Sequence, residues 1–233
     1  MKREVLVLCG GEGTRLRPVV GDRPKGLADI AGRAFLDILV DELLAQGFRR
    51  LVLCTGYRAE QIARHFSRRS DAEFVFSAEP HPLGTGGAVR HALPLVRADT
   101  FAVVNGDSFC RVEYAELFRL HGRTGALASV VLTPATERTD VGFAELAADG
   151  RVVSFNEKQA RTPLVNAGIY VVARQLIERQ PPGAAFSLER ELLPQAIRAG
   201  TCYGHVVPGP LVDIGTPERY SAAQVSLKSV PDA

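Results

Sequence analysis

The sequence predicts an α/β fold built on a doubly wound, mostly parallel sheet. Short apolar runs rich in Val and Leu alternate with segments whose apolar residues repeat at helical spacing. The first run ends in a cluster of glycines, the usual place for a ligand-binding loop in such a sheet. A chain of 233 residues, 46% hydrophobic and 23% charged, can bury the core that this fold needs.

Strands and helices alternate through the first half of the chain. Residues 3–9 are a continuous apolar run, typical of a strand covered on both faces. Residues 34–46 place leucines on one helical face, and Gly47 ends that helix. Further strands are expected at 50–55, 73–77, 101–104 and 127–133, and further helices at 59–66, 88–96 (with a break at Pro94) and 114–121.

The alternation stops after Pro134, where short strand candidates follow one another directly. A turn at Asp149-Gly150 favours antiparallel pairing, so we expect a small antiparallel excursion from the parallel sheet. Thr216 and Pro217 are typical of a helix start. Strands are expected at 142–146, 152–156, 167–172 and 203–207, and helices at 188–199 and 217–227.

Charge and cysteine usage exclude several classes of protein. The formal net charge is +2, which argues against general nucleic-acid binding. The N-terminal apolar run stops at Gly10, and no run approaches about 18 residues, so we expect a cytoplasmic protein without a signal peptide or membrane span. The four cysteines lie far apart without a CxxC pair, so we expect buried, reduced thiols and no zinc site.

The loop after the first strand carries the strongest functional signal. Gly10, Gly11 and Gly13 let the backbone approach a polyphosphate and point its N–H groups inward. Arg15 adds a planar fork for phosphate oxygens, and Lys25 adds a mobile point charge. The pattern is neither a Walker A loop nor GxGxxG. The alternative is a tight turn with surface charges, and the two cations beside it weigh against that alternative.

Two aspartates from distant segments are candidate metal ligands. Asp107 ends an apolar strand and is therefore delivered to the same sheet edge as the glycine loop, and Asp213 follows another short apolar run. A pair of carboxylates suits Mg²⁺, which takes its other ligands from phosphate and water. The alternatives are a turn residue for Asp107 and a helix-cap region for Asp213.

Six segments together resemble the sugar-1-phosphate nucleotidylyltransferase family, in the family's order. The first runs from Gly10 to Pro18 with Pro24-Lys25. The others are 79–88, Asn105-Gly106-Asp107, Glu157-Lys158, 166–170 and 213–217. The resemblance implies a Rossmann-like, GT-A-like sheet in one domain over 1–228, with a nucleotide-binding part (1–133), a sugar-phosphate-binding part (134–228) that holds the antiparallel excursion, and a tail (229–233).

The resemblance also implies a role for each matching residue. Arg15 and Lys25 would be catalytic, and Asp107 and Asp213 would hold Mg²⁺. The nucleotide would contact Leu8, Gly10, Gly11, Gly13, Thr14, Glu79, Gly84 and Thr85, and the sugar phosphate would contact Gly142, Glu157, Lys158 and Asn166. Taken singly, the last four could be a strand glycine, an exposed ion pair and a turn residue. The implied partners are a nucleoside triphosphate and a sugar 1-phosphate, with no nucleic acid or membrane, and a homodimer is among the assemblies allowed.

The segment around Glu79 favours guanine. A carboxylate can accept from the N1–H and N2–H of guanine together, whereas thymine and uracil offer one donor. This argument holds if Glu79 reaches the base edge. A solvated Glu79 would give no information about which base is bound. The short chain and the segments 105–109 and 186–189 most resemble guanylyltransferases acting on D-glycero-α-D-manno-heptose 1-phosphate, which would give GDP-heptose and pyrophosphate.

Three alternatives stay open. The first two are a mannose 1-phosphate guanylyltransferase and an N-acetylmuramate 1-phosphate uridylyltransferase. The third is a non-catalytic nucleotide-sugar sensor, against which the complete set of Arg15, Lys25, Asp107 and Asp213 speaks. One departure from the family is Gly26, where many relatives carry proline; glycine there is expected to loosen the segment that holds Lys25.

Overall fold

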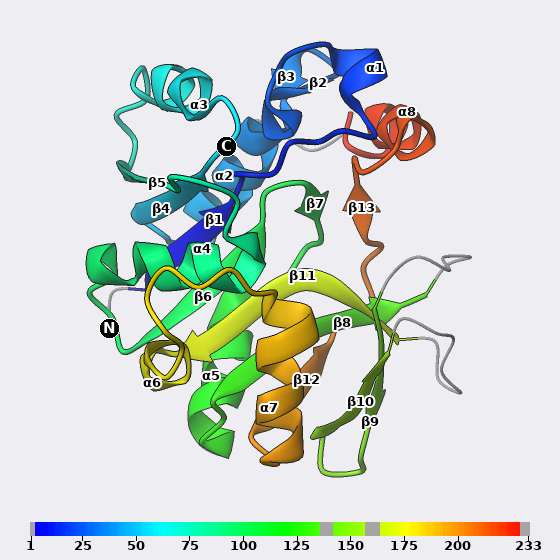
Figure 1. Ribbon diagram of the computed structural model, residues 1–233. Helices are drawn as coiled ribbons and strands as arrows, with labels where there is room; N and C mark the ends of the chain where they lie inside the picture. The colour runs from blue at the N-terminus through cyan, green and yellow to red at the C-terminus, as the bar shows by residue number, and fades with distance from the viewer. Residues whose placement is uncertain (1–2, 136–141, 157–163, 229–233) are drawn as a thin grey trace.

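A nine-stranded sheet with helices on both faces forms the body of the protein (Figure 1). The computed structural model describes residues 3–135, 142–156 and 164–228. The strands run in the order β10-β9-β11-β6-β1-β4-β5, and β8 pairs with β11 and β12. Their bounds are β1 Val5–Leu8, β4 Arg50–Thr55, β5 Glu73–Ala78, β6 Thr100–Asn105, β8 Ala128–Pro134, β9 Phe143–Leu146, β10 Val152–Asn156, β11 Leu164–Ala173 and β12 Cys202–Val206.

The predicted fold class is confirmed. The strands β1, β4, β5 and β6 pair in parallel, and β12 pairs in parallel with β8. Strand β11 is inserted antiparallel between β6 and β8, and β9 and β10 continue from it as an antiparallel pair. The expected excursion therefore enters the main sheet itself, because β11 is ten residues long and its central residues are buried.

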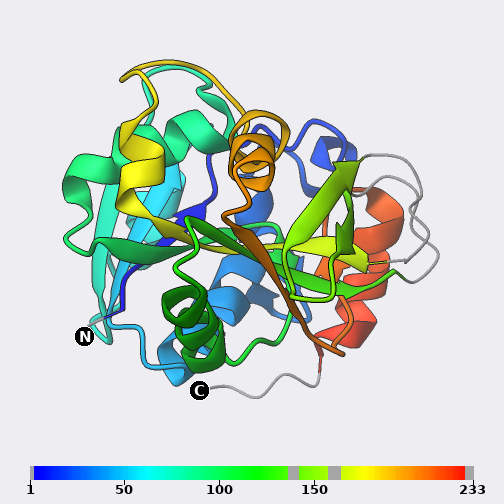
Figure 2. The same ribbon diagram turned by 90° about the horizontal axis from the view of Figure 1, so that it is seen from below.

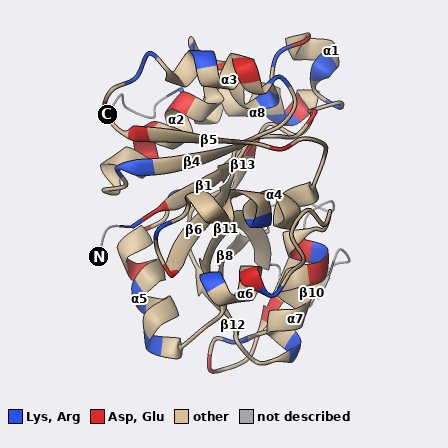
Figure 3. Ribbon diagram, turned by 60° about the vertical axis from the view of Figure 1, so that its left-hand side comes forward, with Lys and Arg blue, Asp and Glu red and all other residues tan. Residues whose placement is uncertain are grey.

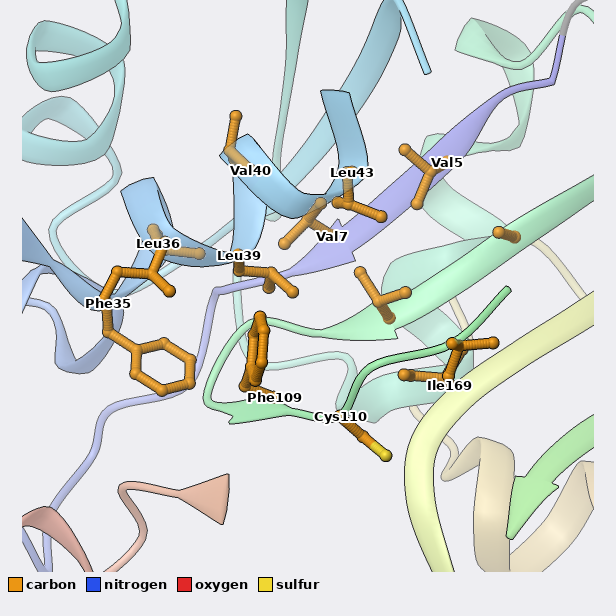
Figure 4. Close-up of a cluster of buried hydrophobic side chains, with 14 of the residues drawn as sticks. Val5, Val7, Phe35, Leu36, Leu39, Val40, Leu43, Phe109, Cys110 and Ile169 are labelled. Carbon is orange, nitrogen blue, oxygen red and sulfur yellow. The ribbon is translucent and has the colours of Figure 1, made fainter. Parts of the chain in front are cut away.

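Successive residues of the parallel strands face opposite sides of the sheet and build two cores. Val5 and Val7 pack with α2 (Phe35–Ala45) on one side, as Figure 4 shows. Leu6 packs on the other side with α4 (Gly84–Ala92). Figure 2 shows the sheet between these two helical layers.

The other helices divide between the same two faces. Helices α3 (Ala59–Phe66), α5 (Tyr114–Thr124) and α8 (Pro217–Ser226) contribute to the core on the α2 side. Helix α6 (Arg174–Glu178), the π-helical turn η3 (Leu188–Leu192) and α7 (Leu193–Arg198) contribute to the core on the α4 side. No helix in the described ranges is both long and apolar enough to cross a membrane.

Helix α4 begins four residues earlier than the sequence predicts. Its first turn contains three glycines, which are poor helix formers. These glycines are selected by packing, because a methyl group on Gly86 would lie 2.2 Å from the Phe186 ring and one on Gly87 would lie 2.6 Å from the Ala184 carbonyl oxygen. After Ala92 the helix tightens into the 3-10 turn η2 (Leu93–Leu95) at the expected break.

Several short elements are absent from the sequence-based expectation. They include α1 (Arg17–Val20), the 3-10 turn η1 (Lys25–Leu27) and the hairpin of β2 (Asp29–Ile30) with β3 (Arg33–Ala34). Two more, β7 (Ser108–Phe109) and β13 (Val212–Asp213), pair antiparallel with each other. This last pairing joins the centre of the chain to its C-terminal part, beside the edge where β1 and β6 end.

Candidate functional site

A pocket of about 450 Å³ opens at the carboxyl ends of β1, β4 and β6. This is the edge at which open α/β sheets bind ligands. We call it the polyphosphate pocket. Its predicted lining residues are Leu8, Gly10, Gly11, Gly13, Thr14, Arg15, Lys25, Glu79, Gly84, Thr85 and Asp107. Lining residues to which the sequence reasoning gave no contact with a substrate are Cys9, Glu12, Gly26, Cys54, Pro82, Ala88, Asn105, Gly106 and Gly215.

The glycine loop is shaped by close backbone contacts. Gly13 has a φ of 60°, and a methyl group there would lie 2.9 Å from the Lys25 Cβ. A methyl group on Gly10 would lie 2.4 Å from the Glu79 Oε1, whereas one on Gly11 would meet nothing within 4 Å. Gly10 and Gly13 are therefore required by packing, and Gly11 faces open space.

Lys25 and Asp107 meet directly. The Lys25 Nζ lies 2.6 Å from the Asp107 Oδ2, and the lysine side chain is only 13% exposed. The next residue, Gly26, is buried, and a methyl group on it would lie 2.6 Å from the Leu36 Cδ1. The expectation that Gly26 loosens this segment was wrong, because Leu36 fills the space beside Gly26 and an ion pair fixes Lys25.

The β7–β13 ladder brings the two predicted metal-binding aspartates together. Asp213 pairs with Ser108, and the Ile214 N–H donates to the Asp107 carbonyl oxygen at 3.1 Å. Asp213 is 11% exposed, and its Oδ1 accepts from the Gly215 N–H (2.8 Å). The backbone pairing places two aspartates on adjacent segments, and their oxygen atoms are of the kind that Mg²⁺ prefers.

Arg15 lies beside the second aspartate segment. A methyl group on Gly215 would be 3.7 Å from the Arg15 Nη2. The Arg219 Nη1 lies 3.4 Å from the Asp213 Oδ1. No cluster of three His, Cys, Asp or Glu side chains suited to a metal lies within the described ranges.

Glu79 is held firmly at the rim of the polyphosphate pocket. Its Oε2 accepts from the Leu83 N–H at 2.9 Å, and its own N–H donates to the Thr55 carbonyl oxygen at 2.9 Å. Its Oε1 faces the backbone of Gly10 and Gly56. Glu79 is therefore a fixed carboxylate at the pocket rather than a solvated loop residue.

A buried hydrogen-bond network joins this pocket to β11. The Glu189 Oε2 accepts from the Thr85 Oγ1 (2.6 Å) and the Ser187 Oγ (2.9 Å), and its Oε1 accepts from the Tyr170 hydroxyl (3.0 Å). The Asn166 Nδ2 donates to the Tyr170 oxygen at 2.6 Å. The sequence reasoning assigned no role to Tyr170 or Glu189; the signal available was that a fully buried tyrosine needs a hydroxyl partner.

The predicted sugar-side residues are only partly brought together. The Asn166 N–H donates to the Gly142 carbonyl oxygen at 3.0 Å, and the Gly168 N–H donates to the Asn166 Oδ1 at 2.9 Å. Gly142 and Asn166 thus meet near the start of β11. Neither lines the polyphosphate pocket, but Asn166 is joined to Thr85 of that pocket through Tyr170 and Glu189. Glu157 and Lys158 lie outside the described residues.

Burial affects the two thiols that line the polyphosphate pocket. Desolvation, with a smaller contribution from the Glu79 charge, raises the pKa of the Cys9 thiol to about 12. Burial also raises the pKa of Cys54 well above its ordinary value. Both thiols are protonated at neutral pH and are therefore poor nucleophiles. This pocket is suited to binding anions rather than to covalent catalysis.

A comparison with protein families fits this geometry. The family described as Nucleotidyl transferase matches residues 4–229. The chain belongs to the nucleotidyl transferase family. The resemblance seen in the sequence is confirmed, and an enzyme is the expected kind of protein.

Two characterised relatives of this nucleotidyl transferase differ in length. It is 32% identical over 227 residues to the D-glycero-alpha-D-manno-heptose 1-phosphate guanylyltransferase of Aneurinibacillus thermoaerophilus, covering 97% of this chain and 98% of the relative. It is 34% identical over 230 residues to the mannose-1-phosphate guanylyltransferase of Mycobacterium tuberculosis. That match covers 96% of this chain and 64% of the relative.

Solved structures agree on the fold. HddC from Yersinia pseudotuberculosis superimposes with a TM-score of 0.85 at 32% identity, covering 95% of this chain and 98% of HddC. HddC has also been solved in complex with GMP-PN, with a TM-score of 0.84. A Bacillus anthracis structure bound to sucrose gives a TM-score of 0.88 at 16% identity, which supports the fold alone.

Proposed function

We propose that this nucleotidyl transferase moves a guanylyl group from GTP to D-glycero-α-D-manno-heptose 1-phosphate, giving GDP-heptose and pyrophosphate. The observation that carries the reaction class is the convergence of Arg15, Lys25 and Asp107 at the glycine loop, with Asp213 held next to Asp107 by the β7–β13 ladder. The heptose assignment is supported by the relative from A. thermoaerophilus, because this chain covers 98% of its length.

The proposed reaction is an in-line displacement. An oxygen of the sugar 1-phosphate forms a bond to the α-phosphorus of the nucleotide, the bond from that phosphorus to the bridging oxygen breaks, and its electron pair leaves with pyrophosphate. The nucleophile is already an anion, so no general base is needed. The protein supplies position and positive charge through Arg15, Lys25 and the backbone N–H groups of the glycine loop.

Asp107 and Asp213 would hold Mg²⁺ in this scheme. The ion would neutralise charge on the phosphates when bound. Lys25, which pairs with Asp107, would then be released toward a phosphate oxygen. The segments containing Gly142, Asn166, Glu157 and Lys158 would hold the sugar phosphate.

The preference for guanine rests on Glu79. The Leu83 N–H fixes one carboxylate oxygen, and lone pairs remain for the N1–H and N2–H of a guanine. The HddC complex with GMP-PN supports the same base. Replacing Glu79 with Gln removes the second acceptor and should raise the KM for GTP about tenfold, with little change in kcat.

A second candidate substrate is mannose 1-phosphate. It is favoured by the relative from M. tuberculosis, which is 34% identical over 230 residues. The two candidates share the guanylyl donor and the reaction, and they differ only in the sugar.

We also propose that residues 1–228 act as one domain. The β7–β13 ladder supports this, since it links the nucleotide part to the sugar-phosphate part.

The decisive experiment is a pyrophosphate-release screen. GTP, ATP, UTP and dTTP would each be paired with heptose, mannose and N-acetylmuramate 1-phosphates. We expect release with GTP and the heptose phosphate. Preference for UTP or dTTP would overturn the role given to Glu79, and nucleotide binding without release in any pair would favour a sensor.

A further inference from the structure

A second hollow lies between helix α3 and the segment that carries Lys25. It has a volume of about 430 Å³. Among the residues that the structure describes, none lines both this hollow and the polyphosphate pocket, so we treat the two as separate. We call it the arginine groove. Its lining residues are Arg23, Leu27, Asp29, Ala34, Gln61, Arg64, His65 and Arg68.

Three arginines that line the groove have no ion-pair partner among the described residues. Arg23, Arg64 and Arg68 are exposed, and their side chains make no ion pair or hydrogen bond with any residue that the structure describes. The neighbouring Arg69 is different, since it contacts three carboxylates at 3.4, 2.6 and 2.5 Å, those of Asp37, Asp41 and Asp71. The carboxylates of Asp37, Asp41 and Asp71 are thus paired with Arg69. Figure 3 shows both positive and negative residues around α3.

The other charged groups near the groove are also engaged. Asp22, next to Arg23, accepts hydrogen bonds from Tyr57 and Arg58. These two hydrogen bonds, that of Tyr57 first, lower the pKa of Asp22. The His65 Nε2 lies 2.9 Å from both oxygens of Asp37. Among the described residues that line the groove, Asp29 is the one acid, and its Oδ1 accepts from the Gly32 N–H at 3.0 Å. Arg68 also borders a neighbouring hollow that contains Asp37, Asp41 and Asp71, the partners of Arg69. Within the groove lining itself, three arginines face one carboxylate.

This chemistry fits a phosphate group on a small organic body. Guanidinium forks match phosphate oxygens in pairs. Leu27 and Ala34 supply an apolar wall, and Gln61 supplies both a donor and an acceptor. The volume is in the range of small-molecule sites. We propose that the arginine groove binds a small molecule carrying a phosphate group, at a site separate from the polyphosphate pocket.

The wall of the groove is connected to the polyphosphate pocket. Arg23 and Leu27 lie on either side of Lys25 in the chain. The Asp29 carbonyl oxygen accepts from the Tyr220 hydroxyl and the Gln224 Nε2, both at 2.6 Å. Those two residues belong to α8, which follows Asp213 closely. A ligand in the groove would therefore contact the segment that carries Lys25, and that segment is hydrogen-bonded to the helix that follows Asp213.

The test is an NMR titration of the ¹⁵N-labelled protein with inorganic phosphate, at ionic strength held constant with chloride. We expect saturable shifts at backbone amides of 23–34 and 59–68. The double variant R64Q/R68Q should lose these shifts. R64K/R68K, which keeps the charge but not the planar fork, should bind several-fold more weakly. R198Q, an exposed arginine on α7, is the matched control and should behave as the parent.

Two results would overturn the proposal. Shifts that never saturate, and that chloride alone reproduces, would mean ionic screening only. Shifts confined to residues 8–15 would mean that phosphate binds the polyphosphate pocket and nothing else. Thermal unfolding of each variant checks that these surface changes leave the fold intact, and R23Q repeats the test outside α3. Because binding is the readout, absent turnover would leave the test unaffected.

Discussion

The two halves of the site are built by different physical means. On the nucleotide side, charged groups at the rim of a parallel sheet meet through an ion pair between Lys25 and Asp107, on a loop shaped by glycines. On the sugar side, β11 carries a largely buried network that runs from Asn166 through Tyr170 to Glu189. The first half offers charge to a substrate, and the second half fixes shape.

This difference teaches where substitutions should affect the rate and where they should affect binding. Charge at the reacting phosphates acts on the transition state, so its removal lowers kcat. A network that holds side chains in place acts on recognition and stability, so its removal raises KM and lowers the free energy of unfolding.

The largest expected effect comes from breaking the charged half. Asp107→Asn removes a carboxylate of the proposed metal site and the partner of Lys25, and turnover should fall by at least about 100-fold. Pyrophosphate release measures this loss. Asp149→Asn is the control, because Asp149 pairs only with Arg151 among the described residues, at the exposed turn between β9 and β10. Unchanged release in Asp107→Asn would refute the role of this aspartate.

The shape of the glycine loop gives the next largest effect. Gly10→Ala puts a methyl group 2.4 Å from the Glu79 carboxylate, and it should cost about 1–3 kcal/mol of stability and raise the KM for the nucleotide. Gly11→Ala meets nothing within 4 Å, so its melting temperature should match that of the parent. Equal melting temperatures for the two variants would contradict the packing role of Gly10.

A third experiment breaks the hydrogen-bond network between Asn166 and Glu189. Tyr170→Phe removes the hydroxyl that joins Asn166 to Glu189, and it should cost about 1–2 kcal/mol of stability. The KM for the sugar phosphate should rise more than kcat falls. Tyr203→Phe on β12 is the control, since the structure gives its hydroxyl no hydrogen bond to a described residue. A loss of kcat with unchanged KM would reverse the proposed division between the halves.

The smallest expected effect is on the free energy of unfolding at acid pH, and it comes from the buried His121 on α5. His121 on α5 is buried against Ser129 on β8, with its Nδ1 3.0 Å from the Ser129 Oγ, and burial lowers its pKa to about 4. The unfolded chain takes up this proton near the ordinary value of 6.5, so stability should fall as pH drops from about 6.5 toward 4. Between pH 7 and 5.5 the loss is about 1 kcal/mol. Chemical denaturation would measure it, and His121→Gln should flatten the dependence.

The elements of the parallel half of the fold could be predicted from the sequence. The bounds predicted for β4 and α3 match the structure, because continuous apolar runs and helical spacing are local signals. The start of α4 was missed, since its glycines disfavour a helix and only their contacts with Phe186 and Ala184 select it. Strand β11 was predicted as 167–172 rather than Leu164–Ala173 because Asn166 interrupts its apolar pattern.

The roles of the site residues stay predictions, but their positions at one sheet edge could be expected from the sequence. The glycine loop and Asp107 follow the ends of β1 and β6, whereas Lys25 was found only through its motif. The pairing of Glu189 with Thr85 and Tyr170 joins three distant segments, and no spacing rule brings them together. The ladder of β7 with β13 has two residues on each side, which is too short for a periodic signal.

The β7–β13 ladder can form only late in synthesis, because its two strands are far apart in the chain. Asp107 and the glycine loop emerge early, whereas Val212 and Asp213 leave the ribosome much later. Closing so long a loop is among the slower steps of folding. A nascent chain would therefore hold a phosphate-binding loop before it holds its second carboxylate. Assembly of the pair at Asp107 and Asp213 would mark the moment at which chemistry can begin.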